Sequence, residues 1–278
     1  MAKSARSQVD VVVIGAGIVG CSTAYYLSKR GAKVALIEKG EVAGEQSSRA
    51  WGWVRQQGRN PREIPLSIFS KGLWSELSSE INADVEWIED GSLKLAYTEE
   101  EMAKFESWAK EARDLGLDTQ VMSASEVKEL ITSLEGSFLG GVYTPSDGQA
   151  EPGKGTEAMA RAAKESGTDL YSHRSVQGFR VEGGTIKEVL TDQGGIEADS
   201  VVCAAGAWSS KLGRMVGVNL PQRVVKGTVV CTEPSEIVSH ITVMSPDVTF
   251  RQKRDGTFYI SNGVRSDYYV NRDSFRDI

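Results

Sequence analysis

The stretch VDVVVIGAGIVGCSTAYYLSKRGAKVALIEK, from Val9 to Lys39, decides the fold of this chain. It opens on a β-branched apolar run, which is typical of a strand buried on both faces. Gly15, Gly17 and Gly20 follow at GxGxxG spacing. In this motif the first glycine makes a tight turn, the second admits a pyrophosphate to the backbone, and the third lets a helix pack on the strand. The pattern predicts a strand, a glycine turn and a helix from Ile18 to about Arg30.

A second strand, Val34 to Ile37, is expected to end on Glu38. This acid follows Gly20 by 18 residues, close to the roughly 20 expected for the carboxylate that holds an adenosine ribose. The N-terminus of the helix offers free N–H groups and positive potential to a pyrophosphate. A carboxylate at this place would repel a 2′-phosphate, which argues against NADP and leaves FAD and NAD both open.

The composition is that of an ordinary globular protein. The chain has 278 residues, of which 40% are hydrophobic and 25% charged, enough for one large or two modest domains. Its net charge of −6 argues against nucleic acid as a partner, because phosphates demand a basic face. No apolar run reaches the length of a membrane span, and no signal-peptide core follows the N-terminus. We expect a cytoplasmic protein, with peripheral association with an inner membrane left open.

Cysteine and histidine are scarce. The three cysteines show no CxxC pairing and are expected to be small buried residues: Cys21, Cys203 and Cys231. His173 and His240 have no ligand spacing, so no metal site is predicted. There is no GxSxG nucleophile motif either. If the protein is an enzyme, a cofactor must carry its chemistry.

A long loop rich in Gly, Ser, Arg and Gln follows Glu38, and loops of this length are usually functional. Trp51, Trp53 and Arg55 alternate with small or aliphatic residues, so an extended segment would place two indoles and a guanidinium on one face. Arg49 and Arg55 are therefore predicted to belong to a site.

The next segment, from Pro65 to about Ser79, has helical periodicity. Its apolar stripe predicts a core-facing helix and consists of Leu66, Phe69, Leu73 and Leu77. Beyond it, Val85 to Ile88 and Leu93 to Tyr97 are expected to pair as a hairpin. Capping boxes at Thr98 and Ser123 predict two further helix starts.

A second strand-to-turn-to-helix pattern occurs late in the chain. Val201 to Cys203 form an expected buried strand, and the small residues Ala204, Ala205 and Gly206 follow before a helix near Trp208. Small residues at such a turn permit close backbone approach by a ligand, which makes this a second candidate cofactor contact.

Three pieces together resemble one family, the FAD-dependent amino acid and amine oxidoreductases of the D-amino acid oxidase type. This family includes glycine oxidase, sarcosine oxidase and the D-amino acid dehydrogenases. The pieces are VVVIGAGIVGCSTAYYLSKRGAKVALIEK, the loop GEQSSRAWGWVRQQGR leading into PLSIFSKGLW, and GGIEADSVVCAAGAWSSKL. The resemblance spans essentially the whole chain.

The resemblance implies an α/β fold of the glutathione-reductase-like flavoprotein type. A discontinuous Rossmann-like FAD-binding domain would comprise residues 1–80 and 146–218. An α+β substrate domain would comprise residues 81–145 and 219–278. Members of the family usually continue for roughly a hundred more residues, so we expect this chain to be a C-terminally truncated piece whose isolated activity is uncertain.

The family also implies a set of cofactor-binding residues. The glycine turn, Glu38 and Lys39 would hold the ADP half of FAD, Ser47 to Arg49 would lie along the pyrophosphate and ribityl chain, and Val176 would border the adenine. The small-residue turn and Trp208 would close over the cofactor. The predicted residues are Gly15, Ala16, Gly17, Ile18, Val19, Gly20, Glu38, Lys39, Ser47, Ser48, Arg49, Val176, Ala204, Ala205, Gly206 and Trp208.

The implied reaction is oxidation of the C–N bond of a D-amino acid, glycine or sarcosine-type amine. A hydride passes to flavin N5, and the imine product hydrolyses. Arg55 lies close to the family's carboxylate-binding arginine, and Arg251, in a late strand, is a second candidate. Dioxygen or a quinone would reoxidise the flavin, and a homo-oligomer or partner subunit is possible. Two alternatives stay open: an NAD-dependent dehydrogenase, and a non-catalytic flavin-binding fragment.

Overall fold

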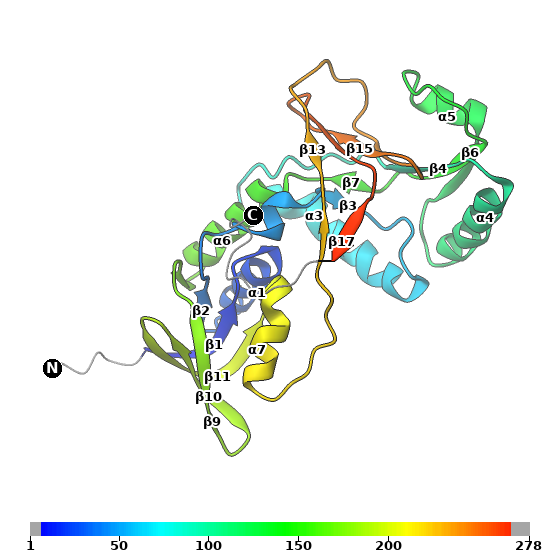
Figure 1. Ribbon diagram of the computed structural model, residues 1–278. Coiled ribbons are helices and arrows are strands. Elements are labelled where there is room, and N and C mark those ends of the chain that lie inside the picture. Colours follow the sequence, from blue (N-terminus) through cyan, green and yellow to red (C-terminus); the bar gives the residue numbers. More distant parts are fainter. Residues whose placement is uncertain (1–6, 268–278) are drawn as a thin grey trace. The chain divides into compact units, whose positions relative to one another are not determined.

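The computed structural model describes residues 7–267, which form two compact units (Figure 1). Within this range the first unit comprises residues 7–50, 152–225 and 267, and the second comprises residues 51–151 and 226–266. The chain thus crosses from one unit to the other several times, as a discontinuous arrangement requires. The structure groups residues 51–80 with the second unit, whereas the sequence prediction assigned them to the first. That the two units bind cofactor and substrate stays a prediction.

A six-stranded sheet forms the centre of the first unit, in the order β8-β2-β1-β11-β10-β9. The first four strands run parallel, and β10 and β9 add to one side in antiparallel fashion. Both expected strands of the opening stretch are present and adjacent, which confirms the α/β interpretation. The strands are β1 (Ser7–Ile14), β2 (Val34–Ile37), β8 (Asp169–Tyr171), β9 (Val176–Glu182), β10 (Thr185–Thr191) and β11 (Gly194–Cys203).

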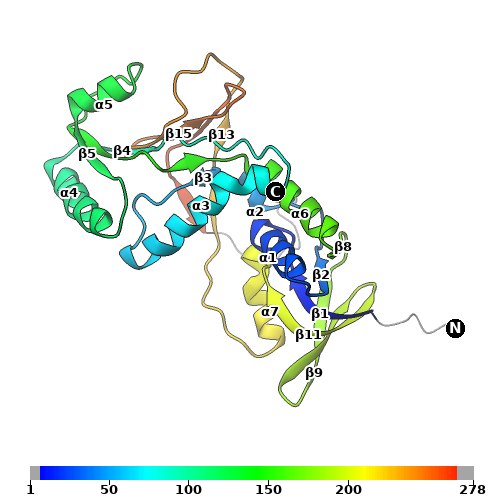
Figure 2. The same ribbon diagram turned by 180° about the vertical axis from the view of Figure 1, so that it is seen from behind.

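Helices α1 (Ile18–Lys29) and α6 (Pro152–Glu165) pack against each other in this unit (Figure 2). Their buried residues are mostly small, which lets the two backbones approach closely. Helix α7 packs Leu212 into the cluster that holds Val12 and Ile14 of β1. The remaining helical segments are α2 (Gln46–Arg49), η2 (Gly206–Trp208) and α7 (Ser209–Met215).

The second unit contains a seven-stranded sheet in the order β13-β16-β15-β14-β4-β6-β5, together with the two-stranded β3-β7 ribbon. A further two-stranded sheet, β12-β17, lies where the chain passes between the units. The strands are β3 (Trp53–Val54), β4 (Ser92–Ala96), β5 (Gln120–Ser123), β6 (Gly140–Thr144), β7 (Gly148–Gln149), β12 (Val225–Gly227), β13 (Val230–Cys231), β14 (Thr242–Met244), β15 (Thr249–Gln252), β16 (Phe258–Ser261) and β17 (Arg265–Asp267).

The prediction that residues 85–88 and 93–97 pair as a hairpin is wrong. β4 pairs with β6 and β14, and from the earlier segment only Ile88 makes a bridge, to Gln149. The reason is competition between partners. Long-range pairing with β6 and β14 fills both edges of β4 and leaves its sequence neighbour no free edge.

The helices of the second unit begin where their caps predict. The Thr98 hydroxyl accepts from the N–H of Glu101 at 3.2 Å, and the Ser123 hydroxyl accepts from the N–H of Glu126 at 3.4 Å, so both capping boxes are confirmed. The helical segments are η1 (Pro61–Glu63), α3 (Ile64–Glu80), α4 (Glu99–Asp114) and α5 (Ala124–Leu130). No helix in the described range is long and apolar enough to cross a membrane.

Helix α3 exists as predicted, but its stripe does not face a core. Leu66, Phe69 and Leu73 are 70%, 65% and 37% exposed, whereas Leu77 is 3% exposed and Ile64 is fully buried. Periodicity identifies which residues share a face of a helix. It carries no information on whether another element covers that face.

The prediction of three buried cysteines is right for one of them. Cys21 of α1 is fully buried, while Cys203 and Cys231 are exposed. Cys21 lies in the interior of helix α1, whereas the other two are the last residues of strands β11 and β13. Composition alone does not distinguish these environments.

Candidate functional site

The glycine turn after β1 packs too tightly for any side chain at two of its three glycines. A Cβ at Gly20 would lie 1.8 Å from the carbonyl oxygen of Gly15, and a Cβ at Gly15 would lie 2.5 Å from that of Ala204. Gly15 also has a φ of +106°, which disfavours other residues. Gly17 is less crowded, with the Ser47 hydroxyl 3.0 Å from the position of its Cβ. These contacts give the first and third glycines the roles that the motif predicts.

Glu38, at the end of β2, is held against this turn. Its Oε2 accepts from the backbone N–H of Ala16 at 2.8 Å, and its Oε1 accepts from that of Gly40 at 2.9 Å. The side chain is largely buried. A carboxylate has about four lone-pair sites, so both oxygens keep capacity to accept from the hydroxyls of a ribose. The acid therefore fits the role that its spacing predicts.

The segment Ser47 to Arg49 is a single helical turn, α2. The Ser47 hydroxyl accepts from the N–H of Ile18 at 2.9 Å, so a distant serine caps the N-terminus of α1. Glu45 binds two cations of this region, with Lys39 Nζ at 2.8 Å and Arg49 Nη1 at 3.0 Å. The predicted contact of this segment with pyrophosphate and ribityl stays a prediction.

The late small-residue turn lies beside the first glycine turn, as the cofactor hypothesis requires. The N–H of Ala204 donates to the carbonyl of Ile14 at 2.8 Å. Gly206 has a φ of +51° and starts the short helix η2. Trp208 lies under the Lys39 ammonium, which is 4.0 Å from the ring centroid. Two segments far apart in sequence thus meet at the carboxyl ends of neighbouring parallel strands, where open α/β sheets bind ligands.

Val176 is the first residue of β9 and packs on the cluster that contains Ile37. Its predicted place beside the adenine is not tested by these contacts. The glycine turn and Glu38 fit the ADP half of FAD, because a backbone turn without Cβ atoms, a helix N-terminus and a largely buried carboxylate converge there. When bound, FAD would be held by the glycine turn, Glu38 and the turn at Ala204.

In the second unit, Arg55 directly follows the short strand β3. Its Nη1 donates to the carbonyl oxygen of Gln57 at 2.5 Å. Burial lowers the pKa of this guanidinium, and the positive charge of Arg59 lowers it further, while Asp147 acts in the opposite direction. The rings of Trp51 and Trp53 lie 5.2 Å apart between centroids, in agreement with their predicted placement on one face.

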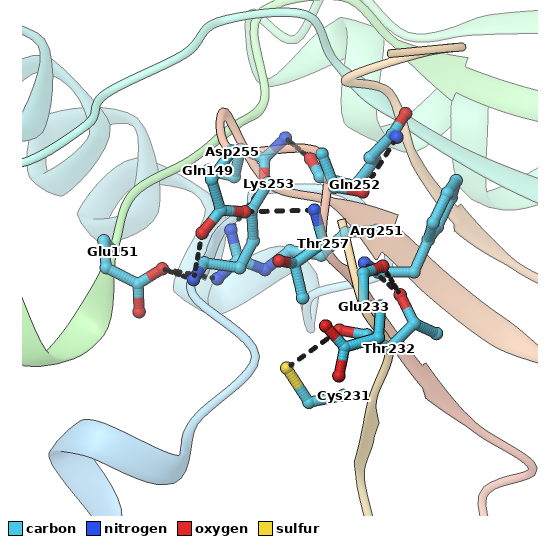
Figure 3. Close-up of polar contacts among 12 residues, drawn as sticks. Gln149, Glu151, Cys231, Thr232, Glu233, Arg251, Gln252, Lys253, Asp255 and Thr257 are labelled. Atoms are coloured by element: carbon cyan, nitrogen blue, oxygen red, sulfur yellow. Dashed lines mark hydrogen bonds and ion pairs between the residues drawn. The ribbon is translucent and has the colours of Figure 1, made fainter. Parts of the chain in front are cut away.

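Arg251 of β15 is enclosed by polar groups, with only 2% of its surface exposed (Figure 3). Nη1 donates to Gln149 Oε1 at 2.5 Å, and Nη2 forms an ion pair of 3.5 Å with Glu151 Oε2. The guanidinium stacks on Tyr259 at 4.9 Å from the ring centroid. Its Nε and Nη2 are buried without a hydrogen bond to any of residues 7–267, as is Nε1 of Trp53. Burial lowers the pKa of Arg251, partly offset by Glu151.

Sequence reasoning missed the polar residues that surround these arginines. Gln149 and Glu151 contact Arg251, although about a hundred residues of sequence separate them from it. Asp147, fully buried, accepts from the N–H groups of Gln56 and Gln57 next to Arg55. In the sequence Asp147 precedes Gly148 and reads as an ordinary turn residue. No local signal marks it as buried.

Comparison with known proteins decides the family. The family described as FAD dependent oxidoreductase, DAO, matches residues 10–277. The chain belongs to this family. It is 31% identical to glycine oxidase of Geobacillus kaustophilus over 256 residues, which cover 89% of this chain and 67% of the relative. It is 30% identical to the mitochondrial sarcosine dehydrogenase of Homo sapiens over 243 residues, which cover 84% of this chain and 26% of that protein.

Solved structures agree with the fold. L-proline dehydrogenase from P. horikoshii superposes with a TM-score of 0.89 and 30% identity, over 94% of this chain and 71% of that one. Glycine oxidase from Geobacillus kaustophilus superposes with a TM-score of 0.88 and 28% identity, over 97% and 75%. This chain therefore corresponds to between a quarter and three quarters of the length of these relatives. Family membership makes FAD the cofactor and removes the NAD alternative.

Proposed function

We propose that the protein oxidises the C–N bond of an amino acid or secondary amine that carries a carboxylate, and that Arg55 binds this carboxylate. The observation that carries the proposal is the environment of Arg55, whose guanidinium is partly buried and donates to a carbonyl group, that of Gln57. This neutral acceptor does not compensate the positive charge, and the Asp147 carboxylate compensates it only in part. A substrate carboxylate would compensate it.

Burial strengthens this interaction. Desolvation is the largest cause of the lowered pKa of Arg55, so the cation has lost part of its hydration in the folded protein. A carboxylate that approaches it gains more than it would from a fully hydrated cation, because the effective dielectric constant is lower. A planar guanidinium also offers two parallel N–H donors to the two carboxylate oxygens.

Arg251 is a second proposed contact for an anionic group. Its buried Nε and Nη2, like Trp53 Nε1, have no hydrogen-bond acceptor in the described part of the chain. Buried donors of this kind cost free energy until an acceptor reaches them. Ion pairing with Glu151 already compensates part of the charge of Arg251. We therefore rank Arg251 behind Arg55.

The bound FAD would supply the redox chemistry, accepting a hydride from the carbon next to the amine nitrogen and leaving an imine that water hydrolyses. The task of the chain is orientation: a carboxylate fixed by Arg55 restricts the substrate to poses that present one face of that carbon. The amine must be deprotonated when it reacts. The proposed final electron acceptor is dioxygen or a quinone.

Anaerobic bleaching of the flavin tests this proposal on the full-length gene product. The panel contains D-amino acids, glycine derivatives and N-methyl amines without a carboxylate. We expect bleaching by a carboxylated amine and a loss of about tenfold or more in its apparent affinity in Arg55→Ala, partly restored in Arg55→Lys. Arg62→Ala, which removes an exposed arginine a few residues further along the chain, is the matched control.

Two results would contradict the proposal. Equal affinity of natural protein and Arg55→Ala for every carboxylated amine would remove Arg55 from the site, and the same measurement on Arg251→Lys would then decide between the two arginines. Full FAD occupancy without bleaching by any member of the panel would favour the non-catalytic alternative.

A further inference from the structure

We propose that Asp147 is a positioning residue for Arg55: its buried carboxylate fixes the backbone of the two residues that follow Arg55 and thereby sets the direction of the guanidinium. This inference rests on the proposed function, in which Arg55 binds the substrate carboxylate. Asp147 lies between β6 and β7 and is itself too enclosed to meet a substrate.

The first step is the set of hydrogen bonds by which Asp147 holds the loop. Oδ1 accepts from the backbone N–H of Gln56 at 2.6 Å and from its side-chain Nε2 at 3.1 Å. Oδ2 accepts from the backbone N–H of Gln57 at 3.2 Å. Both carboxylate oxygens are therefore bound to the loop, across about ninety positions of chain. Asp147 has no exposed surface, and both glutamines are 3% exposed.

The second step is the anchor that Gln57 adds. Its side-chain Nε2 donates to the carbonyl of Ser92 at 2.7 Å and to that of Val142 at 3.0 Å, on the adjacent strands β4 and β6. The backbone of Gln57 is thus fixed by Asp147 and its side chain by the sheet. A loop residue whose backbone and side chain are both hydrogen-bonded has little conformational freedom.

The third step links this support to the arginine. Arg55 Nη1 donates to the carbonyl oxygen of Gln57, the residue whose N–H is bound by Asp147. The acceptor carbonyl lies one Cα beyond the N–H that Asp147 binds, so the direction of the guanidinium depends on a residue whose backbone Asp147 holds in place. Positions that bind or orient a substrate need such support, because a displacement of about 1 Å costs much of their effect.

An ionised aspartate satisfies this geometry with both of its oxygens as acceptors. Both oxygens face N–H donors, so asparagine would turn its own NH₂ group toward one of them and lose at least one hydrogen bond. The negative charge also favours the protonated form of Arg55. Asp114 offers a control, because it is an exposed aspartate of the same unit, at the end of helix α4.

The test uses the full-length, FAD-loaded protein labelled with ¹⁵N-arginine. The Nε–H signal of Arg55 is assigned by its loss in Arg55→Ala. We expect this signal to shift and broaden in Asp147→Asn and to stay unchanged in Asp114→Asn. Gln57→Met, which removes the anchoring donors but keeps the side-chain length, should move it in the same direction and provides a milder variant if Asp147→Asn folds poorly. An unmoved Arg55 signal in folded Asp147→Asn or Gln57→Met overturns the inference.

Kinetics on the carboxylated amine that bleaches the flavin give a second readout. Asp147→Asn should raise KM about tenfold while kcat changes less than about threefold, and should have no further effect on KM in an Arg55→Ala background. An equal effect with and without Arg55 would show general loosening and overturn the inference. If Arg55→Ala itself leaves KM unchanged, the proposed function fails, and the NMR result still decides whether Asp147 positions Arg55.

Discussion

The carboxylate of Glu38 accepts a hydrogen bond from the backbone N–H of Ala16 at 2.8 Å. This bond joins the end of β2 to the glycine turn after β1, across 22 positions of sequence. The residue expected to hold the ribose therefore also holds the turn expected to hold the pyrophosphate. Loss of the carboxylate should damage both contacts at once.

Glu38→Gln should weaken FAD binding while the protein stays folded. The amide can accept with one oxygen only and would turn an NH₂ group toward the N–H of Ala16 or Gly40. The loss of one or two bonds to a charged acceptor predicts a rise of roughly 10- to 100-fold in the Kd for FAD, measured by flavin fluorescence. Glu41→Gln, at an exposed neighbouring carboxylate paired with His173, should bind FAD normally. Equal affinity of Glu38→Gln and natural protein would contradict the role of Glu38.

A pair of Gly→Ala substitutions should have opposite effects. At Gly20 a Cβ would lie 1.8 Å from the carbonyl oxygen of Gly15, so Gly20→Ala must push α1 away from the turn and should abolish flavin retention. At Gly72, within helix α3, an added Cβ would have no described atom within 4 Å apart from its chain neighbours and its own helix backbone, so Gly72→Ala should raise the free energy of unfolding by about 0.5–1 kcal/mol. Flavin content and urea unfolding measure the two effects. Normal flavin content in Gly20→Ala would refute the tight packing described for the turn.

The three thiols should differ in reactivity. Burial raises the pKa of Cys21 to about 12, and the charge of Glu38 adds to the effect, so its thiolate is scarce near neutral pH. Cys203 and Cys231 are exposed. A thiol reagent at pH 8 should label these two in the native protein and Cys21 only after denaturation, as peptide mapping can show. Rapid native labelling of Cys21 would argue against the packing of α1.

Two leucines of α3 should respond differently to truncation. Leu77→Ala removes a side chain that is 3% exposed and should lower the free energy of unfolding by about 2–5 kcal/mol. Leu66 is 70% exposed, so Leu66→Ala should change it by about 0.5 kcal/mol or less. Urea unfolding of both variants measures the difference. A large loss in Leu66→Ala would show that its side of the helix is covered after all.

Asp147 should make stability depend on pH in a defined direction. Burial raises its pKa above the ordinary value of 3.8, although hydrogen bonds from Gln56 and Gln57 oppose the shift. Between the ordinary and the raised pKa, the folded state binds more protons than the unfolded state, so the contribution of Asp147 to stability falls as pH rises through that window. The free energy of unfolding of natural protein minus that of Asp147→Asn should therefore decrease from pH 4 upward. A constant or increasing difference would contradict the raised pKa.

Local chemistry accounts for the parts that the sequence predicts well. The glycine turn needs residues without a Cβ, and the two capping boxes satisfy donors within one helical turn, so their signals lie within a few neighbouring residues. Helix α3 was likewise located correctly from periodicity. Three other predictions were wrong: the core-facing stripe of α3, the hairpin before β4 and the burial of Cys231. Each of these depends on which distant elements pack nearby.

By itself, the sequence determined the dinucleotide-binding stretch, the class of fold and, through its resemblance, the family and its FAD cofactor. Short-range spacing is sufficient for the stretch and the class of fold, because turn geometry, helix dipole and strand alternation act over a few residues. The family and its cofactor needed three pieces that lie far apart in the sequence. Only the tertiary structure decided what surrounds the two arginines. Asp147 reaches Gln56 and Gln57, and Gln149 reaches Arg251, across about a hundred positions. Burial and charge compensation arise from such long-range contacts, and no local pattern of residues encodes them.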